Sequence, residues 1–343
     1  MSRITSLVRP NIAALAPYST ARDEYDGPIG IFLDANESPY DNGYNRYPDP
    51  HQAQLKARIC PLKGLRPENL FLGNGSDEAI DLIFRIFCEP GKDNAVIMAP
   101  SYGMYGVAAA INDVAVRSVR LGEDFSLDTE ALFDACDART KVMYLCSPNN
   151  PSGNAFPKEQ LLGICDRFPG VLVVDEAYVD FSSKGTLAKE AMQRDNLVVL
   201  QTMSKARAMA GLRIGMAISS EEIIRLMSMV KYPYNLSRAA MEKALSMIGK
   251  PIDEEVATII QERDRLASLL PRYPFIRTVF PSDANFILVR VDDADGLYGY
   301  LLGKGIIVRN RNRVPGCSGC LRLTVGLPAE NEALLNALDT YSA

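Results

Sequence analysis

The feature that most constrains the fold is the alternation of short apolar runs with amphipathic segments between residues 94 and 230. The apolar runs, which we predict to be strands, lie at 95–98, 114–121, 142–146, 171–174, 197–200 and 212–218. The predicted helices lie at 104–111, 159–167 and 221–230. Continuous apolar strands that alternate with helices are typical of a largely parallel sheet that helices cover on both faces. The sequence therefore predicts an α/β fold, with its site beyond the carboxyl ends of the strands.

The pattern changes after Asn235. Two helical segments at about 238–249 and 252–270 precede strands at 286–291, 306–308 and 321–325. A last helix begins near Pro328, and proline is well suited to a first helical turn. Residues 1–30 show no strong periodicity. We therefore predict an N-terminal arm (1–30), a large domain (31–237) and a small α+β domain (238–343).

Composition excludes several classes of protein. The chain has 343 residues, of which 47% are hydrophobic, so a substantial core is expected. The net charge of −5 gives no sign of a nucleic-acid or anionic-membrane partner. No stretch approaches the roughly 18 apolar residues of a membrane span. Residues 1–19 contain two arginines and no long apolar run, which argues against a signal peptide. We expect a cytoplasmic protein.

The single histidine, His51, removes further mechanisms. A Ser-His-Asp triad would have to use His51, which has no nucleophile motif nearby, and a site with several histidine ligands is impossible, so no metal is predicted. Most of the seven cysteines lie in apolar runs, as buried reduced thiols do. The motif Cys317-Ser-Gly-Cys320 leaves a redox pair or half a zinc site open, but without a second pair we favour ordinary loop thiols.

Polar loops follow four of the predicted strands. They are Pro100-Ser101-Tyr102, residues 147–151 (Ser-Pro-Asn-Asn-Pro), Asp175-Glu176-Ala177-Tyr178 and Thr202-Met203-Ser204-Lys205. In an open α/β sheet such loops converge. Residues 72–78 form a glycine-rich loop that opens a helix, with Ser76 as a plausible N-cap. The spacing fits neither a dinucleotide-binding fingerprint nor a Walker loop.

Together these residue types suit one cofactor. A phosphate dianion suits the helix start at residues 75–77, the hydroxyl of Ser204 and the guanidinium of Arg213. A lysine such as Lys205 forms a Schiff base with an aldehyde. A buried aspartate such as Asp175 keeps a pyridinium nitrogen protonated, because an opposite charge favours the charged form. Pyridoxal phosphate needs all of these groups.

The order and spacing of these residues resemble the fold-type I pyridoxal-phosphate aminotransferases, and within them the histidinol-phosphate aminotransferase family. The matching stretches are 17–22, 34–40, 46–49, 73–78, 100–105, 146–153, 174–178, 204–215, 305–309 and 318–326. The Ser-Pro-Asn-Asn-Pro-Ser-Gly and lysine stretches are shared by the whole superfamily. The Pro-Tyr-x-x-Ala-Arg arm (17–22) and the pair Arg309 and Arg322 indicate the narrower family.

The resemblance implies pyridoxal phosphate and assigns roles around its ring. Lys205 forms the Schiff base and shuttles the proton between the substrate Cα and cofactor C4′. Asp175 pairs with the pyridinium nitrogen. Asn150 and Tyr178 donate hydrogen bonds to the ring hydroxyl, and Tyr102 stacks on the ring face.

The resemblance also implies the ligands of the phosphate, which are Ser76, Asp77 through its backbone, Ser204 and Arg213. Tyr47 would reach the phosphate of the neighbouring subunit's cofactor, so a homodimer is expected.

On the substrate side, the resemblance implies that Arg322 clamps a carboxylate, a bidentate task for which arginine suits better than lysine. Asn150 also lies against the substrate. Tyr18 and Arg309 are the candidates for a distal phosphate. Arg207 stands where relatives often have a small or aromatic residue, and we expect it to point away from the cofactor.

The implied reaction is a ping-pong transfer from L-histidinol phosphate to 2-oxoglutarate. It yields imidazole acetol phosphate and L-glutamate, within histidine biosynthesis. Two alternatives share the cofactor residues, namely an aminotransferase for aromatic or branched amino acids and a phosphothreonine decarboxylase. A non-catalytic pyridoxal-phosphate-binding module is a third, but it predicts an attached DNA-binding segment, and the 30-residue arm is too short and too little basic for one.

Overall fold

The computed structural model describes residues 4–20 and 30–342. Their packing divides the chain into two compact units. The first holds the described residues up to Asp93, with Ala108–Val114 and Leu187–Lys250. The second holds Asn94–Val107, Ala115–Thr186 and the described residues from Pro251 onward. The predicted boundaries near residues 30 and 237 stay a prediction, and residues 21–29 of the predicted arm lie outside the described ranges.

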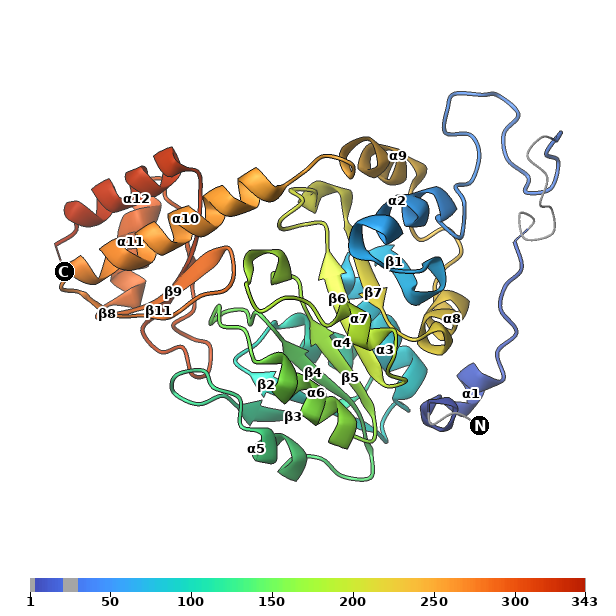
Figure 1. Ribbon diagram of the computed structural model, residues 1–343, viewed down its shortest axis with the longest axis horizontal. Coiled ribbons are helices and arrows are strands. Elements are labelled where there is room, and N and C mark those ends of the chain that lie inside the picture. The colour runs from blue at the N-terminus through green and yellow to red at the C-terminus, as the bar shows by residue number, and fades with distance from the viewer. Residues whose placement is uncertain (1–3, 21–29, 343) are drawn as a thin grey trace. The chain divides into compact units, whose positions relative to one another are not determined.

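The first unit is built on three antiparallel strands in the spatial order β1 (Leu70–Asn74), β7 (Ile214–Ile218) and β6 (Leu197–Thr202). Helix α3 (Ser76–Phe87) packs against all three strands, and α8 (Glu221–Val230) packs on α3 and β1 (Figure 1). The apolar residues Ile80, Ile83, Phe84 and Phe87 recur at helical spacing on α3 and are buried, which explains its place against the strands. The other helices of this unit are α1 (Pro10–Ala13), α2 (Ala53–Lys63), α7 (Ala188–Ala191) and α9 (Arg238–Met247).

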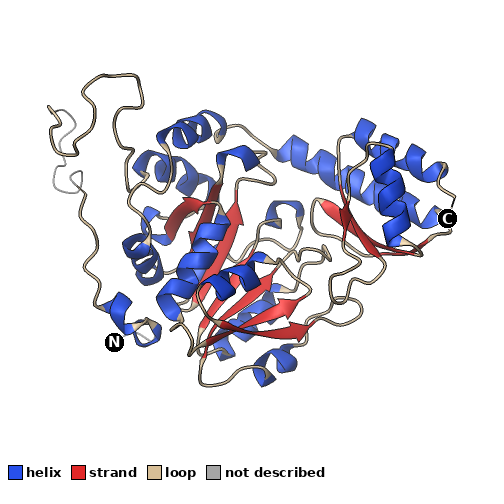
Figure 2. Cartoon of the chain, turned by 180° about the vertical axis from the view of Figure 1, so that it is seen from behind, coloured by secondary structure: helices blue, strands red, loops and turns tan. Residues whose placement is uncertain are grey.

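The second unit contains four parallel strands in the order β5 (Val171–Asp175), β4 (Thr140–Cys146), β2 (Asn94–Ala99) and β3 (Ala115–Arg120). Helix α6 (Lys158–Arg167) makes the crossover from β4 to β5, and α5 (Thr129–Asp134) precedes β4 (Figure 1). Figure 2 shows the chain from behind, with strands in red and helices in blue. Helix α4 (Met104–Ile111) follows β2. Because the strands are parallel, Cys146 lies opposite Asp175, and the loops that follow both residues leave the same edge.

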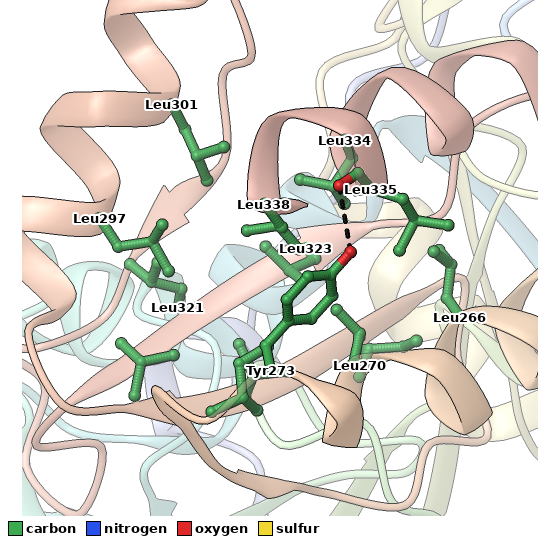
Figure 3. Close-up of a cluster of buried hydrophobic side chains, with 14 of the residues drawn as sticks. Leu266, Leu270, Tyr273, Leu297, Leu301, Leu321, Leu323, Leu334, Leu335 and Leu338 are labelled. Atoms are coloured by element: carbon green, nitrogen blue, oxygen red, sulfur yellow. Dashed lines mark hydrogen bonds between the residues drawn. The ribbon is translucent and has the colours of Figure 1, made fainter. Parts of the chain in front are cut away.

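The second unit also holds an antiparallel sheet in the order β10 (Arg309–Asn310), β11 (Cys320–Thr324), β9 (Phe286–Val291) and β8 (Ile276–Val279). Its helices are α10 (Asp253–Leu269), α11 (Ala294–Gly303) and α12 (Pro328–Asp339). Leucines of these elements surround Tyr273, whose hydroxyl donates to the Leu335 carbonyl at 3.0 Å (Figure 3). This single cluster therefore anchors the helices to one face of the sheet.

Most predicted elements are confirmed, and α4, α8 and β9 have the predicted bounds. The predicted last helix begins at Pro328, as expected. The structure describes no helix that is both long and apolar enough to cross a membrane.

Four predictions are corrected. The segment at 72–78 is not all loop, because residues up to Asn74 complete β1 through pairing with β7. The run at 306–308 is not a strand, because the Ile306 amide donates to Leu301 at the end of α11, and pairing begins only at Arg309. Strand β3 is not covered on both faces, since it lies at the edge of the four parallel strands and is mostly exposed. The N-cap of α3 is Gly75, not Ser76.

Candidate active site

Asp175 ends β5, and its side chain is only 2% exposed. The hydroxyl of Tyr105 donates to its Oδ2 at 2.7 Å, and the amide of Ala177 donates to its Oδ1 at 3.0 Å. A buried carboxylate needs such donors, because an unpaired charge in the interior is costly. The Tyr105 ring stacks on Tyr144, with 5.0 Å between the ring centroids. Burial, and then the Asp175 charge, raise the pKa of Tyr105, so its hydroxyl stays a donor.

The sequence prediction did not include Tyr105. Its signal is the spacing Tyr102-x-x-Tyr105, which places the second tyrosine one helical turn after the first. In the structure the two rings meet edge to face, with centroids 5.6 Å apart.

Asn150 joins two other predicted residues of the second unit. Arg322 on β11 donates from Nη1 to Asn150 Oδ1 at 2.5 Å. The Asn150 Nδ2 lies 3.5 Å from the hydroxyl of Tyr178. Phe286 on β9 holds both neighbours, because the Tyr178 ring meets it edge to face and the Arg322 guanidinium lies 5.1 Å from its centroid. Burial raises the pKa of Tyr178, which keeps its hydroxyl protonated.

A second arginine, which the sequence prediction did not include, reaches the same amide oxygen. Arg311 lies 3.4 Å from Asn150 Oδ1 through its Nη2. Arg309 stands directly opposite Arg322 across the β10–β11 ladder, and its side chain is exposed. The Nε atoms of Arg311 and Arg322 are buried and have no hydrogen-bond partner among the residues that the structure describes. The available signal was the alternation of Arg309 and Arg311 in an extended segment.

The loops after β2 and β4 are held together by Asn149, which is fully buried. Its Nδ2 donates to the Pro100 carbonyl at 3.0 Å and to Ser152 Oγ at 2.7 Å. Its Oδ1 accepts from the Ser101 hydroxyl at 3.0 Å. Asn149 therefore fixes the backbone on which Tyr102 and Asn150 stand. It lies inside a recognised motif, but its role was not predicted.

In the first unit, Ser76 and Asp77 form the first turn of α3, and Arg213 precedes β7. The Arg213 guanidinium lies 3.4 Å from Asp77 Oδ2, and the Gly75 amide donates to the Arg213 carbonyl at 2.8 Å. A Cβ on Gly75 would come within 2.7 Å of Arg213 Nη2. A Cβ on Gly215 would lie 2.0 Å from the Ser76 amide nitrogen. Gly215 is therefore needed for this close approach of two backbone segments, whereas Gly75 is favoured by its φ of +78°. Both lie beside a helix start suited to an anion.

Ser204 and Lys205 lie in the turn that follows β6. The hydroxyl of Thr202 donates to Ser204 Oγ at 2.9 Å, and the Ser204 amide donates back to Thr202 Oγ1 at 3.1 Å. Arg207 has a structural role, because its Nη1 donates to the carbonyls of Ile248 and Lys250 just beyond α9. Its guanidinium is therefore engaged with the end of that helix.

Four residues singled out in the sequence lie apart from these networks. Tyr47 is 52% exposed and stacks on Tyr234, with 4.5 Å between centroids. Tyr18 is 75% exposed. Cys317 and Cys320 are free, buried thiols against Phe280 and its neighbours. Hydrogen bonding from Cys317 lowers the pKa of Cys320.

Comparison with known proteins gives a consistent family. The model of the aminotransferase class I and II family matches residues 31–338. A curated histidinol-phosphate aminotransferase of Parabacteroides distasonis is 52% identical over 340 residues, which is 98% of this chain and 99% of the relative. One of Bacteroides fragilis is 48% identical over 344 residues, or 99% of this chain and 100% of the relative.

Solved structures agree with the sequences. The histidinol-phosphate aminotransferase of Clostridium acetobutylicum has a TM-score of 0.78 at 27% identity, covering 85% of this chain and 89% of its own. That of Sinorhizobium meliloti, a complex with pyridoxal-5'-phosphate, has a TM-score of 0.78 at 23% identity, covering 85% and 82%. The predicted fold class is confirmed, with a large, mostly parallel sheet, its helices and a smaller antiparallel sheet. The chain belongs to the class I and II aminotransferase family and is a pyridoxal-phosphate-dependent transaminase.

Proposed function

We propose that this protein transfers the amino group of L-histidinol phosphate to 2-oxoglutarate in histidine biosynthesis, releasing imidazole acetol phosphate and L-glutamate. The supporting observation in the structure is the arginine cluster on Asn150, in which two buried Nε atoms have no hydrogen-bond partner among the described residues and would suit an oxyanion. Two near-full-length relatives that carry this activity in their names support the same substrate.

Pyridoxal phosphate fits the residues present. Because Gly215 has no Cβ, the start of α3 packs directly against it, and this helix start lies close to the Arg213 guanidinium, an arrangement suited to a phosphate. We propose that Ser76, the Asp77 backbone, Ser204 and Arg213 hold the phosphate, and that Asp175, Asn150, Tyr178 and Tyr102 hold the ring. When bound, the cofactor supplies an electrophilic carbon and an electron sink for the amino transfer.

The side chains then have separate tasks. The Lys205 amine would take the proton from the substrate Cα as general base and then, as general acid, deliver it to the cofactor carbon C4′ rather than back to Cα. Asp175 would keep the ring nitrogen protonated. The Tyr105 hydroxyl donates a hydrogen bond to Asp175 Oδ2 at 2.7 Å and so stabilises the buried carboxylate. Asn150 and Tyr178 orient the ring through its hydroxyl. Arg322 binds the substrate oxyanion, while Tyr18 and Arg309 remain the proposed contacts for the outer part of the substrate.

A donor panel tests the substrate. L-Histidinol phosphate, phenylalanine, leucine and phosphothreonine are compared with 2-oxoglutarate as acceptor, and kcat/KM is measured for each. We expect the first to exceed the others by at least tenfold. A preference for phenylalanine or leucine, or carbon dioxide release from phosphothreonine, would replace the proposed substrate with one of the alternatives. Lys205→Ala is the control, because it should lose turnover and the cofactor's lysine-dependent visible absorption with every donor.

We also propose a homodimer in the cytoplasm. Exposed apolar side chains gather between residues 31 and 47, where Ile31 is 91% and Leu33 is 88% exposed, together with Tyr40, Tyr44 and Tyr47. Such a concentration is typical of an interaction surface. A second copy would cover it and would place Tyr47 at the neighbouring cofactor phosphate.

Subunit complementation tests this placement. The variants Tyr47→Phe and Lys205→Ala are mixed, dissociated and reassociated. If Tyr47 acts across the interface, each mixed dimer regains one intact site, and activity rises above that of either parent. Activity that stays at the average of the two parents would place Tyr47 in its own subunit's site or outside any site.

A further inference from the structure

We propose that Arg311 is a specificity-determining residue that acts with Arg322 to select a doubly charged oxyanion, a phosphate monoester, over a carboxylate. The inference deepens the proposed function and rests on it for the identity of the substrate. It concerns a residue that no sequence motif indicated.

The strand pairing brings three guanidinium groups together. Arg309 pairs with Arg322 across the β10–β11 ladder, and the Arg311 amide continues this pairing by donating to the Cys320 carbonyl at 2.9 Å. Residues two apart in an extended strand point to the same face, so Arg309 and Arg311 share a side. Like charges directly opposite each other on a ladder destabilise it. The fold therefore holds an arrangement that is unfavourable unless an anion binds.

No acidic side chain among the described residues forms an ion pair with Arg309, Arg311 or Arg322. The neutral amide oxygen of Asn150 is shared by Arg311 and Arg322. Burial, then the charges of Arg322 and Arg309, lower the pKa of Arg311, which reflects the same excess of positive charge. The buried, unpaired Nε atoms of Arg311 and Arg322 supply donors for one oxyanion.

The number of charges indicates which oxyanion. A carboxylate carries one charge and is matched by one bidentate arginine, for which Arg322 suffices. A phosphate monoester carries nearly two charges near neutral pH and has three acceptor oxygens. Arg311 matches the additional charge and oxygen. In the proposed reaction the same site receives a phosphate ester in one half-reaction and a dicarboxylic acid in the other, so Arg311 should matter for the first alone.

The test uses the holoenzyme and the variants Arg311→Gln and Arg311→Lys. Arg313→Gln is the matched control, because Arg313 is exposed and lies two residues from Arg311. Its replacement by glutamine removes the same charge. Methyl phosphate and acetate are titrated by calorimetry, and KM is measured separately for the phosphate donor and for 2-oxoglutarate. Arg311→Gln should weaken methyl phosphate binding and raise the donor KM by about 10- to 100-fold, the range expected for a lost charged hydrogen bond. Acetate binding and the KM for 2-oxoglutarate should change less than threefold, and Arg311→Lys should retain part of the preference.

Equal losses for methyl phosphate and acetate would overturn the proposal, as would a loss in Arg313→Gln equal to that in Arg311→Gln. A lower cofactor affinity in Arg311→Gln, with no change in methyl phosphate binding, would also overturn it, because Arg311 would then act only by positioning Asn150. The methyl phosphate arm does not depend on the physiological donor. If the donor panel fails while Arg311→Gln still loses methyl phosphate selectively, the proposed function is wrong and the arginine assignment stands.

Discussion

Replacing Tyr105 with phenylalanine isolates one buried hydroxyl. The ring that stacks on Tyr144 is kept, so the variant removes only the donor that lies 2.7 Å from Asp175 Oδ2. Both residues are at most 2% exposed, so water does not replace the donor. A hydrogen bond to a charged group contributes about 1.5–3 kcal/mol, and we expect the free energy of unfolding at pH 7 to fall by that amount.

The pH dependence gives a second, independent prediction. Burial and Asp175 raise the pKa of Tyr105 in the folded state above its ordinary value. A group of this kind stabilises the protein fully below its unfolded pKa of about 10, and that stability is lost as the pH rises toward the folded value. Above pH 10, the free energy of unfolding of the wild type should therefore fall by about 1.4 kcal/mol per pH unit more than that of Tyr105→Phe. The difference between their free energies of unfolding should therefore be smaller at pH 11 than at pH 10.

Urea unfolding of the apoprotein at pH 7, 9, 10 and 11 measures both quantities. Tyr298→Phe is a suitable control, because no described residue forms a hydrogen bond with the Tyr298 hydroxyl. We expect that control to stay within about 0.5 kcal/mol of the wild type. A Tyr105→Phe variant that is as stable as the control at pH 7, or that has the wild-type slope above pH 10, would refute the role given to this hydroxyl.

Gly215→Ala should lower cofactor affinity at least tenfold in a fluorescence titration, because its Cβ would lie 2.0 Å from the Ser76 nitrogen; Gly163→Ala, with open space around its Cβ, should have no such effect. Arg207→Ala should lower the free energy of unfolding in urea by about 1 kcal/mol, because the carbonyls of Ile248 and Lys250 lose a donor. The KM values for both substrates should stay unchanged, and a change in either would indicate that Arg207 affects substrate binding. Cys317 and Cys320 are fully buried, so iodoacetamide should label them only after unfolding; rapid labelling of the native protein would favour the redox alternative.

Local pattern was enough for the elements whose own residues determine them. Helices α4 and α8 and strand β9 have the predicted bounds, because their apolar residues alone mark the buried face. Strand β1 was missed because Gly73 and Asn74 have the composition of a loop. Its ladder depends on β7, where Leu72 lies opposite Met216, far away in the chain. Propensity in such short segments is overridden by tertiary pairing.

The residues of the site also fall into those that the sequence indicated and those that only the structure revealed. Asn150, Tyr178 and Arg322 were predicted from motifs, because each stands within a short matching stretch, even though these stretches lie far apart in the chain. They did not supply Tyr105 or Arg311, whose roles exist only through contacts with Asp175, 70 residues away, and Asn150, 161 residues away. In the sequence Arg311 is one of several arginines in a basic loop, and nothing local separates it from the exposed Arg313. What separates them is the burial of the Arg311 Nε atom and the contact of its guanidinium with Asn150, and both are properties of the folded chain. An unpaired buried donor is costly to a fold, and a bound oxyanion would remove that cost at the Nε atoms of Arg311 and Arg322.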